Sequence, residues 1–243
     1  MARERYLLDG GEETIHQPQK ETGKKTPKSQ WENFWYYHKW HVIVGVFLTF
    51  VVLFFVYDMT SKVSPDYEIG MITETAYPSE TIDALQTEIT KYAQDRNGDG
   101  KVIVSVNNYV MQTDTSGGMV DPNVRMAGYV KVTNDLSNGT SMIFITDDKS
   151  FRNEQDELQM FTYLDGSKPA ENAKDYEKMR ISLADCKRLS TLKLNDTPSV
   201  SREILYKLSI SMRTIEDTQL EKQQDKTAYY ADSKKLFDEI TKK

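Results

Sequence analysis

Histidine, tryptophan and cysteine are nearly absent from most of this 243-residue chain. All three histidines and all three tryptophans lie at or before residue 41, and Cys186 is the single cysteine. Ser-His-Asp hydrolases and Cys-His peptidases need an imidazole, and so does a histidine-based zinc site. Such sites are therefore excluded after residue 41. A single cysteine also excludes a disulfide framework, and we expect Cys186 to be a small packed residue.

Basic charge and nucleotide motifs are lacking as well. The formal net charge is −6, which argues against a general basic surface for nucleic acid. Neither the GxGxxG nor the GxxxxGK pattern occurs, so the common nucleotide fingerprints are missing. Carboxylate-only chemistry, as in glycosidases, stays open because the chain contains 37 acidic residues.

One uncharged segment interrupts this polar chain. Residues 42–57 read VIVGVFLTFVVLFFVY, which approaches the roughly 20 apolar residues that span a bilayer as a helix. The preceding FWYYHKW, residues 34–40, is rich in the aromatic residues that settle at membrane interfaces. The run is longer than an ordinary signal-peptide core, and no small-x-small cleavage site follows it. The sequence therefore predicts an uncleaved membrane helix over residues 34–58, with the lipid bilayer as a partner.

Lysines decide the predicted orientation. Only Lys62 follows the span closely, whereas several lysines precede it: Lys20, Lys24, Lys25, Lys28 and Lys39. The positive-inside rule then places the N-terminus in the cytoplasm. We therefore expect a single-pass protein of the cell membrane, with a disordered cytoplasmic tail over residues 1–33. A linker over residues 59–65 and an extracellular domain over residues 66–243 would follow.

Beyond the span, strand patterns alternate with helix patterns. Three runs have the apolar or β-branched composition of strands: YEIGMIT (67–73), VIVSVNNYV (102–110) and SMIFIT (141–146). Helical patterns follow each of them, namely from an N-cap at Ser79, over residues 120–139, and from Ser150 to Leu164. This order predicts an α/β domain with a mostly parallel sheet flanked by helices.

Residues 120–139 fit two patterns. Apolar residues alternate over part of this segment as in a strand, but five residues also form one apolar helical face: Met126, Tyr129, Val130, Thr133 and Leu136. Asp121-Pro122 supplies a helix start, and Asn138-Gly139 supplies a stop. We therefore expect a helix.

The last third of the chain is less regular. Residues 166–179 read as a surface excursion, and residues 183–189 as a turn or two of helix. LYKLSISMR, residues 205–213, alternates like a half-exposed strand. The final segment, residues 226–243, predicts a helix with four inward residues: Tyr229, Leu236, Phe237 and Ile240.

The stretch DRNGDGKV, residues 95–102, resembles the first half of a calcium-binding loop. Asp95, Asn97 and Asp99 occupy the first three ligand positions of such a loop, but Val106 stands where the bidentate carboxylate belongs. Its two glycines tolerate positive φ, which suits a tight turn between helix and strand. We expect such a turn, which binds calcium weakly or not at all, and no other cofactor.

A candidate ligand site follows from the predicted topology. Ligands of parallel α/β sheets bind beyond the carboxyl ends of the strands, where the strand order switches. The polar residues at the three predicted ends are Thr73, Glu74, Asn107, Asn108, Thr146 and Asp147. A small ligand bound by hydrogen bonds is expected there.

Four stretches carry a resemblance to known proteins: WENFWYYHKWHVIVGVF, PDYEIGMIT, DRNGDGKV and SMIFITDD. They resemble a group of single-pass, N-terminally anchored membrane proteins of Gram-positive gut bacteria that has no assigned activity. The β-α-β-α-β order is also similar to one lobe of a periplasmic-binding-protein or flavodoxin-like fold. The first resemblance implies topology, and the second implies a fold without fixing a function.

Two functions fit these observations. The first is a membrane-anchored binding or envelope-assembly module without catalytic activity, which binds a small ligand or a partner protein of the envelope or a transporter. The alternative is a carboxylate-dependent hydrolase of cell-envelope glycan. A cleft with two facing carboxyl groups about 5–10 Å apart would favour the hydrolase.

Overall fold

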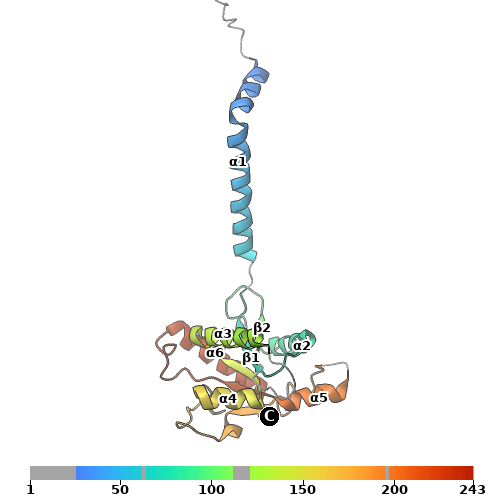
Figure 1. Ribbon diagram of the computed structural model, residues 1–243, viewed down its shortest axis with the longest axis vertical. Coiled ribbons are helices and arrows are strands. Elements are labelled where there is room, and N and C mark those ends of the chain that lie inside the picture. Colours follow the sequence, from blue (N-terminus) through green and yellow to red (C-terminus); the bar gives the residue numbers. More distant parts are fainter. Residues whose placement is uncertain (1–25, 62–63, 112–120, 195–196, 243) are drawn as a thin grey trace, which may run out of the picture. The chain divides into compact units, whose positions relative to one another are not determined.

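The computed structural model describes residues 26–61, 64–111, 121–194 and 197–242 (Figure 1). The chain divides into two compact units, Met1–Val63 and Ser64–Lys243. The boundary between them falls inside the linker predicted over residues 59–65.

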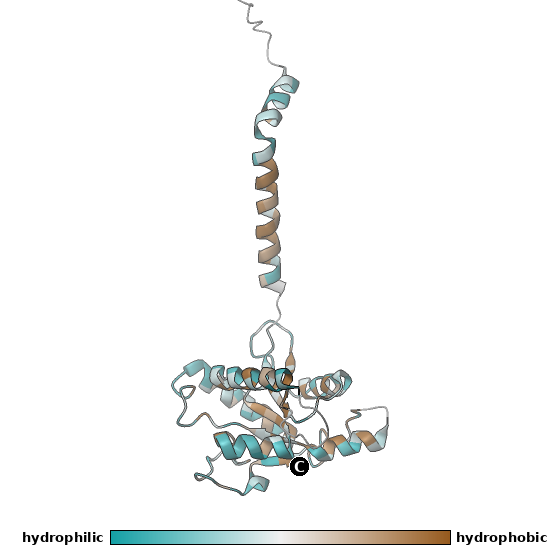
Figure 2. Ribbon diagram, viewed as in Figure 1, coloured by the Kyte–Doolittle hydropathy of each residue, from teal (hydrophilic) through white to brown (hydrophobic). Residues whose placement is uncertain are grey.

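The first unit contains one described helix, α1 (Pro27–Ser61), of 35 residues. At about 1.5 Å per residue it is about 50 Å long, which exceeds the ~30 Å hydrocarbon core of a bilayer. Its most apolar window is not buried at all, and Figure 2 shows the apolar stretch along its middle. The helix is therefore long and apolar enough to cross a membrane. It extends past both ends of the predicted span, while residues 1–25 of the predicted tail lie outside the described residues.

The second unit is built on a five-stranded sheet of order β2-β1-β3-β5-β4. Its strands are β1 (Tyr67–Thr73), β2 (Val104–Val110), β3 (Ile143–Asp147), β4 (Arg180–Ser182) and β5 (Leu208–Met212). β1 runs parallel to both β2 and β3, whereas β5 runs antiparallel to both β3 and β4. The sheet is therefore mixed, and the predicted parallel arrangement holds for β2, β1 and β3.

Helices connect and cover these strands. They are α2 (Ser79–Thr90), α3 (Pro122–Asn138), α4 (Asp148–Leu158), the short 3-10 helix η1 (Tyr176–Lys178), α5 (Pro198–Lys207) and α6 (Gln224–Thr241). The segment between β4 and β5 leaves and re-enters the sheet at the same edge, with α5 running directly into β5. Because the chain leaves β4 and enters β5 at the same end of the sheet, these two neighbouring strands run antiparallel.

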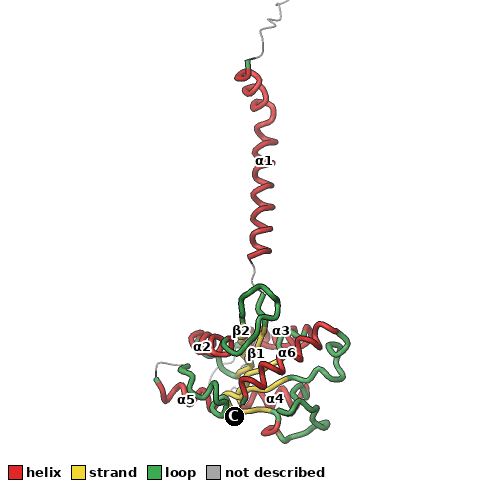
Figure 3. Tube along the Cα trace, turned by 180° about the vertical axis from the view of Figure 1, so that it is seen from behind, coloured by secondary structure: helices red, strands yellow, loops and turns green. Residues whose placement is uncertain are grey.

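The two faces of the sheet carry separate hydrophobic cores. On one face, Ile69 and Ile145 belong to a cluster with side chains of α2, α5 and α6. On the other face, Phe144 belongs to a cluster with Val132 of α3 and Phe151 of α4. Helices thus cover both faces, as the opposite views in Figures 1 and 3 show. An α/β fold of this layered kind was predicted from the alternating patterns.

Two predicted helix starts differ from the structure. α2 begins at Ser79 itself, with Pro78 in the cap position. α4 is capped by Asp147, whose side chain accepts a hydrogen bond from the Ser150 backbone at 2.8 Å, and not by Ser150. It ends at Leu158 instead of Leu164, because Gln159 adopts a left-handed conformation at φ 50°.

α3 is a helix, as predicted, but its buried face is not the predicted one. Asp121 accepts a hydrogen bond from Asn123 N, and Gly139 ends the helix at φ 58°. The buried residues are Gly128, Val132 and Asp135. A Cβ at Gly128 would lie 2.3 Å from the Val110 carbonyl oxygen, so glycine permits this close approach to β2.

A buried hydrogen-bond network explains why the polar Asp135 faces inward. Its carboxylate accepts hydrogen bonds from the Tyr109 hydroxyl at 2.6 Å and from the Ser141 hydroxyl at 2.6 Å. The Ser141 backbone N–H donates a third, at 2.8 Å. Buried polar groups that are satisfied in this way can fix the orientation of a helix.

The C-terminal third confirms one prediction and corrects another. Tyr229, Leu236, Phe237 and Ile240 of α6 are buried, as predicted. A strand is present within the predicted range 205–213, but it is limited to Leu208–Met212, because the first residues of the range complete α5. The predicted half-exposure is wrong, since all of β5 is buried. β5 lies between β3 and β4, so both of its edges and both of its faces are covered.

Candidate functional site

The carboxyl edge of the sheet, where β1, β3 and β4 end and β5 begins, brings four predicted site residues together. Asp147 joins two strands at this edge: the Glu74 backbone N–H donates to its Oδ2 at 2.7 Å, and its Oδ1 caps α4. The Thr73 hydroxyl donates to the Thr75 carbonyl at 2.9 Å. Thr146 is buried, and its carbonyl accepts a hydrogen bond from the Ser209 hydroxyl at 3.3 Å. One of these hydrogen bonds joins two predicted site residues, Glu74 and Asp147, and the others join site residues to Thr75, Ser150 and Ser209.

Asn107 and Asn108 do not belong to this edge. In the register of the sheet Asn107 lies beside Gly70 and Asn108 beside Met71, whereas Val110 is the residue level with Thr73. The Asn107 amide donates to the Glu68 carboxylate at 2.7 Å. β2 ends at Val110, as the predicted strand does, but Tyr109 is buried and hydrogen-bonded to α3, so the strand stays in the sheet past both asparagines. The two asparagines were therefore wrongly assigned to the carboxyl edge.

A cavity of about 800 Å³ opens at the same carboxyl edge, on the side of β4 and β5. We call it the edge cleft. It is lined by Asp148, Leu164, Glu177, Arg180, Ile181, Ser182, Asp185, Lys187, Tyr206, Lys207 and Ser209. Asp148 follows the predicted site residue Asp147, and Ser209 pairs with Thr146 in the sheet. The cleft therefore adjoins the predicted position but is displaced toward strands whose pairing is non-local.

Arg180 forms a fixed wall of the edge cleft. Its side chain is 11% exposed, and its Nη2 lies 2.5 Å from Asp148 Oδ1. The guanidinium also stacks on the ring of Phe151, with 4.7 Å between Cζ and the ring centroid. Hydrogen bonds from Arg152 and then from Arg180 hold the pKa of Asp148 below its ordinary value, although partial burial acts in the opposite sense. Asp148 is therefore an ionised hydrogen-bond acceptor at neutral pH.

The rim of the edge cleft combines an aromatic ring with charges of both signs. Tyr206, in the last turn of α5, is 66% exposed. Three cations line the cleft, Arg180, Lys187 and Lys207, and three carboxylates oppose them, Asp148, Glu177 and Asp185. The apolar part of the lining comes from Leu164 and Ile181. Such a wall offers donors, acceptors and an apolar ring face without a net charge.

Three residues of the edge cleft, Arg180, Tyr206 and Lys207, were not among the predicted site residues. Tyr206 and Lys207 fell within the predicted strand over residues 205–213, and Arg180 came directly after the predicted surface excursion. Pro198 was the local signal for α5, because it occupies the first turn of that helix. A helix predicted from Pro198 would have placed Tyr206 on an exposed last turn.

The loop after β4 confirms the interpretation of Cys186. Its thiol is buried and lies 3.4 Å from the Ser182 carbonyl oxygen. Burial raises the pKa of Cys186 to about 12, so the reactive thiolate is scarce at neutral pH. Cys186 is thus a packed residue beneath the edge cleft.

The loop DRNGDGKV forms a tight turn whose oxygens accept backbone hydrogen bonds. Gly98 and Gly100 adopt φ of 75° and 80°. The Asp95 carboxylate accepts from Gly98 N at 2.7 Å and from Gly100 N at 2.9 Å. Asn97 Oδ1 accepts from Asp99 N, and Asp99 Oδ1 from Lys101 N.

Across the ranges that the structure describes, no group of three or more His, Cys, Asp or Glu is placed to hold a metal. The predicted tight turn, with positive φ at both glycines in this loop, is confirmed. Weak or absent calcium binding there stays a prediction.

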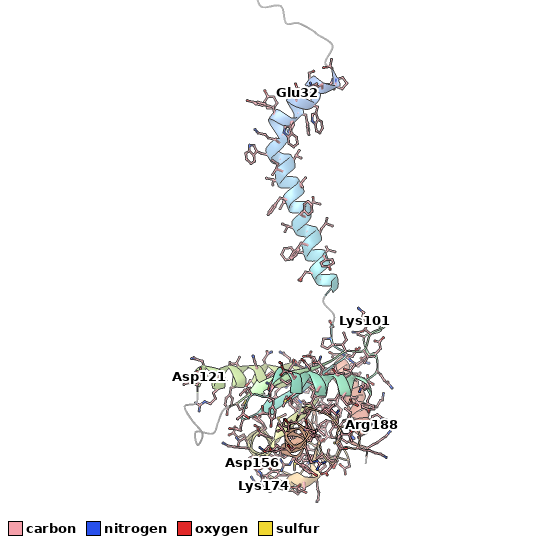
Figure 4. The ribbon with its side chains drawn as sticks, turned by 90° about the vertical axis from the view of Figure 1, so that its right-hand side faces the viewer. Glu32, Lys101, Asp121, Asp156, Lys174 and Arg188 are labelled. Carbon is pink, nitrogen blue, oxygen red and sulfur yellow. The ribbon has the colours of Figure 1, made fainter. Side chains whose placement is uncertain are left out.

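One ion pair joins two residues that do not line the edge cleft. Lys174 lies 2.8 Å from Asp156 and so ties the loop after α4 back to that helix, with both residues labelled in Figure 4.

No family model, curated protein or solved structure matches this chain, so its function follows from the geometry of the site.

Proposed function

We propose that this chain is a membrane-anchored binding module whose second unit holds a glycan fragment in the edge cleft without cleaving it. α1 is the anchor, with its N-terminus in the cytoplasm and the second unit outside the cell, as the lysine asymmetry indicates. Glycans of the cell envelope are then the nearest ligands of this chemistry.

The composition of the edge cleft carries the proposal. Equal numbers of cations and carboxylates leave no net attraction for an anion or a cation. A sugar ring offers hydroxyl donors and acceptors to both kinds of group, and its apolar face can stack on an exposed ring such as Tyr206. Binding sites of this size combine an apolar surface with a few placed polar groups that determine orientation.

The alternative, a carboxylate-dependent glycan hydrolase, has less support. It needs one carboxyl group that keeps its proton near neutral pH beside an ionised one. Asp148 in the cleft is held ionised by two arginines. In the described part of the chain the carboxyl group with a raised pKa, about 7 because of burial, is Glu154, and it does not line the cleft.

The test measures retention of soluble envelope-glycan fragments on the immobilised second unit, residues 64–243. Wild-type protein should retain fragments and release them at unchanged length. Tyr206→Ala should weaken retention about tenfold, which corresponds to the loss of one stacked ring. Tyr129→Ala, at an exposed tyrosine of α3, is the matched control and should leave retention unchanged. Equal loss in both variants, or no retention, would refute binding in the cleft, and shortened fragments would favour the hydrolase.

A further inference from the structure

α3 turns an apolar face toward solvent. Met126, Tyr129 and Val130 are 65%, 43% and 60% exposed, and Thr133 is exposed beside them. These four residues follow the i, i+3, i+4, i+7 spacing of one helical face. We call this face the outer stripe. It lies opposite the buried Gly128, Val132 and Asp135, so the core of this unit does not explain it.

The outer stripe is a local feature of α3. Exposed large apolar side chains elsewhere in the described second unit are scattered singly over other elements: Leu158, Val200 and Tyr206. Single exposed apolar residues are ordinary, whereas a contiguous patch marks an interaction surface. Figure 4 shows α3 with its side chains, beginning at the labelled Asp121.

We infer that the outer stripe docks against the outer stripe of a second copy of this chain, with the two α3 helices antiparallel. A two-fold axis between positions 129 and 130 would place Met126 against Thr133 of the second copy. The same axis would place Tyr129 against Val130. Each contact then sets a large side chain against a smaller one, which permits close packing.

Charge agrees with this arrangement. The same axis sets Arg125 of one copy beside Asn134 of the other, so like charges do not meet across the interface. A lipid surface fits less well, because a helix that lies in a membrane interface carries a strongly basic polar face. The outer stripe has Arg125 on one flank and the neutral Asn134 on the other.

Membrane anchoring compensates for the small area of this interface. One helix pair buries less than the roughly 800 Å² per partner of a standard soluble interface. Confinement to a bilayer raises the effective concentration of the copies. Gly45 and Thr49 also form a small-xxx-small pair on α1, which allows two membrane helices to approach closely. This step rests on the anchoring part of the proposed function. It implies a dimer in the membrane and a monomer for the detached unit.

The test is disulfide cross-linking of the full chain in phosphatidylcholine vesicles. Cys186 is buried, so an introduced cysteine is the reactive thiol. Val130→Cys lies next to the proposed axis, and under mild oxidation it should give on the order of tenfold more disulfide dimer than Val200→Cys, the matched exposed valine on α5. Flotation with the vesicles checks anchoring separately, so a failure to anchor is distinguishable from a failure to dimerise.

A second experiment tests the antiparallel register. Chains with Met126→Cys are mixed with chains carrying Thr133→Cys, with tags of different size. The mixed disulfide should dominate, because about 10 Å along the helix axes separates the two copies of position 126. Equal cross-linking of Val130→Cys and Val200→Cys, or none in floated vesicles, would overturn the dimer. A polarity-sensitive dye attached to Val130→Cys could instead report a lipid environment. If the unlabelled variant also failed to cross-link, that result would overturn the dimer in favour of the bilayer.

Discussion

Gly70 provides a sensitive test of how the sheet is packed. It lies in β1 beside Phe144 of β3, and an added Cβ would stand 2.5 Å from Phe144 Cε1 and 2.6 Å from Cδ1. Phe144 is fully buried, and the centroid of its ring lies 6.1 Å from that of Phe161. The ring must therefore move by about 1 Å in a close-packed core, and such overpacking costs about 1–3 kcal/mol. Gly70→Ala should lower the free energy of unfolding of residues 64–243 by about 2 kcal/mol, measured by urea denaturation.

A double-mutant cycle identifies the clash as the cause. Phe144→Leu alone should cost about 1–2 kcal/mol, because it removes part of a buried ring. In Gly70→Ala/Phe144→Leu the smaller side chain leaves room for the new methyl group. The double variant should therefore be at least about 1 kcal/mol more stable than the sum of the single effects predicts. Full additivity, or a Gly70→Ala change within about 0.5 kcal/mol of wild type, would refute the packing argument.

Three further predictions concern the loop, the buried glutamate and the topology. Gly100→Val should lower the free energy of unfolding by about 1 kcal/mol or more, because φ is 80° at this position. Asp99→Asn should leave the melting temperature unchanged with or without calcium. A micromolar calcium isotherm that is abolished by Asp99→Asn would contradict the turn. Burial raises the pKa of Glu154 from 4.5 to about 7, so stability present below pH 4.5 should fall as pH rises through 7, by up to about 3 kcal/mol. Glu154→Gln should remove that dependence in urea titrations at pH 4.5–8. Protease added to intact cells should cut residues 58–243 and spare residues 1–39, and the reverse pattern would disprove the orientation.

Local patterns predicted helices and strands better than they predicted which face is buried. In α3 the apolar spacing and both ends of the helix were recognisable from the sequence. The buried face is instead the one that carries Gly128 and Asp135. Gly128 fits against the Val110 carbonyl, and Asp135 accepts hydrogen bonds from Tyr109 and Ser141. Both contacts join residues of different elements, so a periodicity within one helix does not contain them.

The candidate site was predictable as an edge and not as a cleft. The parallel strands β1 and β3 put Thr73, Glu74 and Asp147 together, as the topological rule requires. The edge cleft depends on β5 inserting between β3 and β4, which is a non-local pairing. Asn108 was wrongly placed at this edge for a different reason. The buried hydrogen bond of Tyr109 keeps β2 in the sheet beyond Asn108.

The outer stripe and the edge cleft lie at opposite ends of the strand order, and this has a consequence for binding. α3 packs beside β2 and the cleft lies beside β4, so about four strand spacings, roughly 19 Å, separate them. A dimer through the outer stripes would leave both clefts open, and two sites on one assembly bind a repeating polymer more tightly than one site does. Val130→Asp in the full chain should therefore weaken binding of long glycan chains to vesicles by on the order of tenfold or more, while binding of a short fragment stays unchanged. Tyr206→Ala should weaken both. Loss of short-fragment binding in Val130→Asp would show that the two surfaces are not independent.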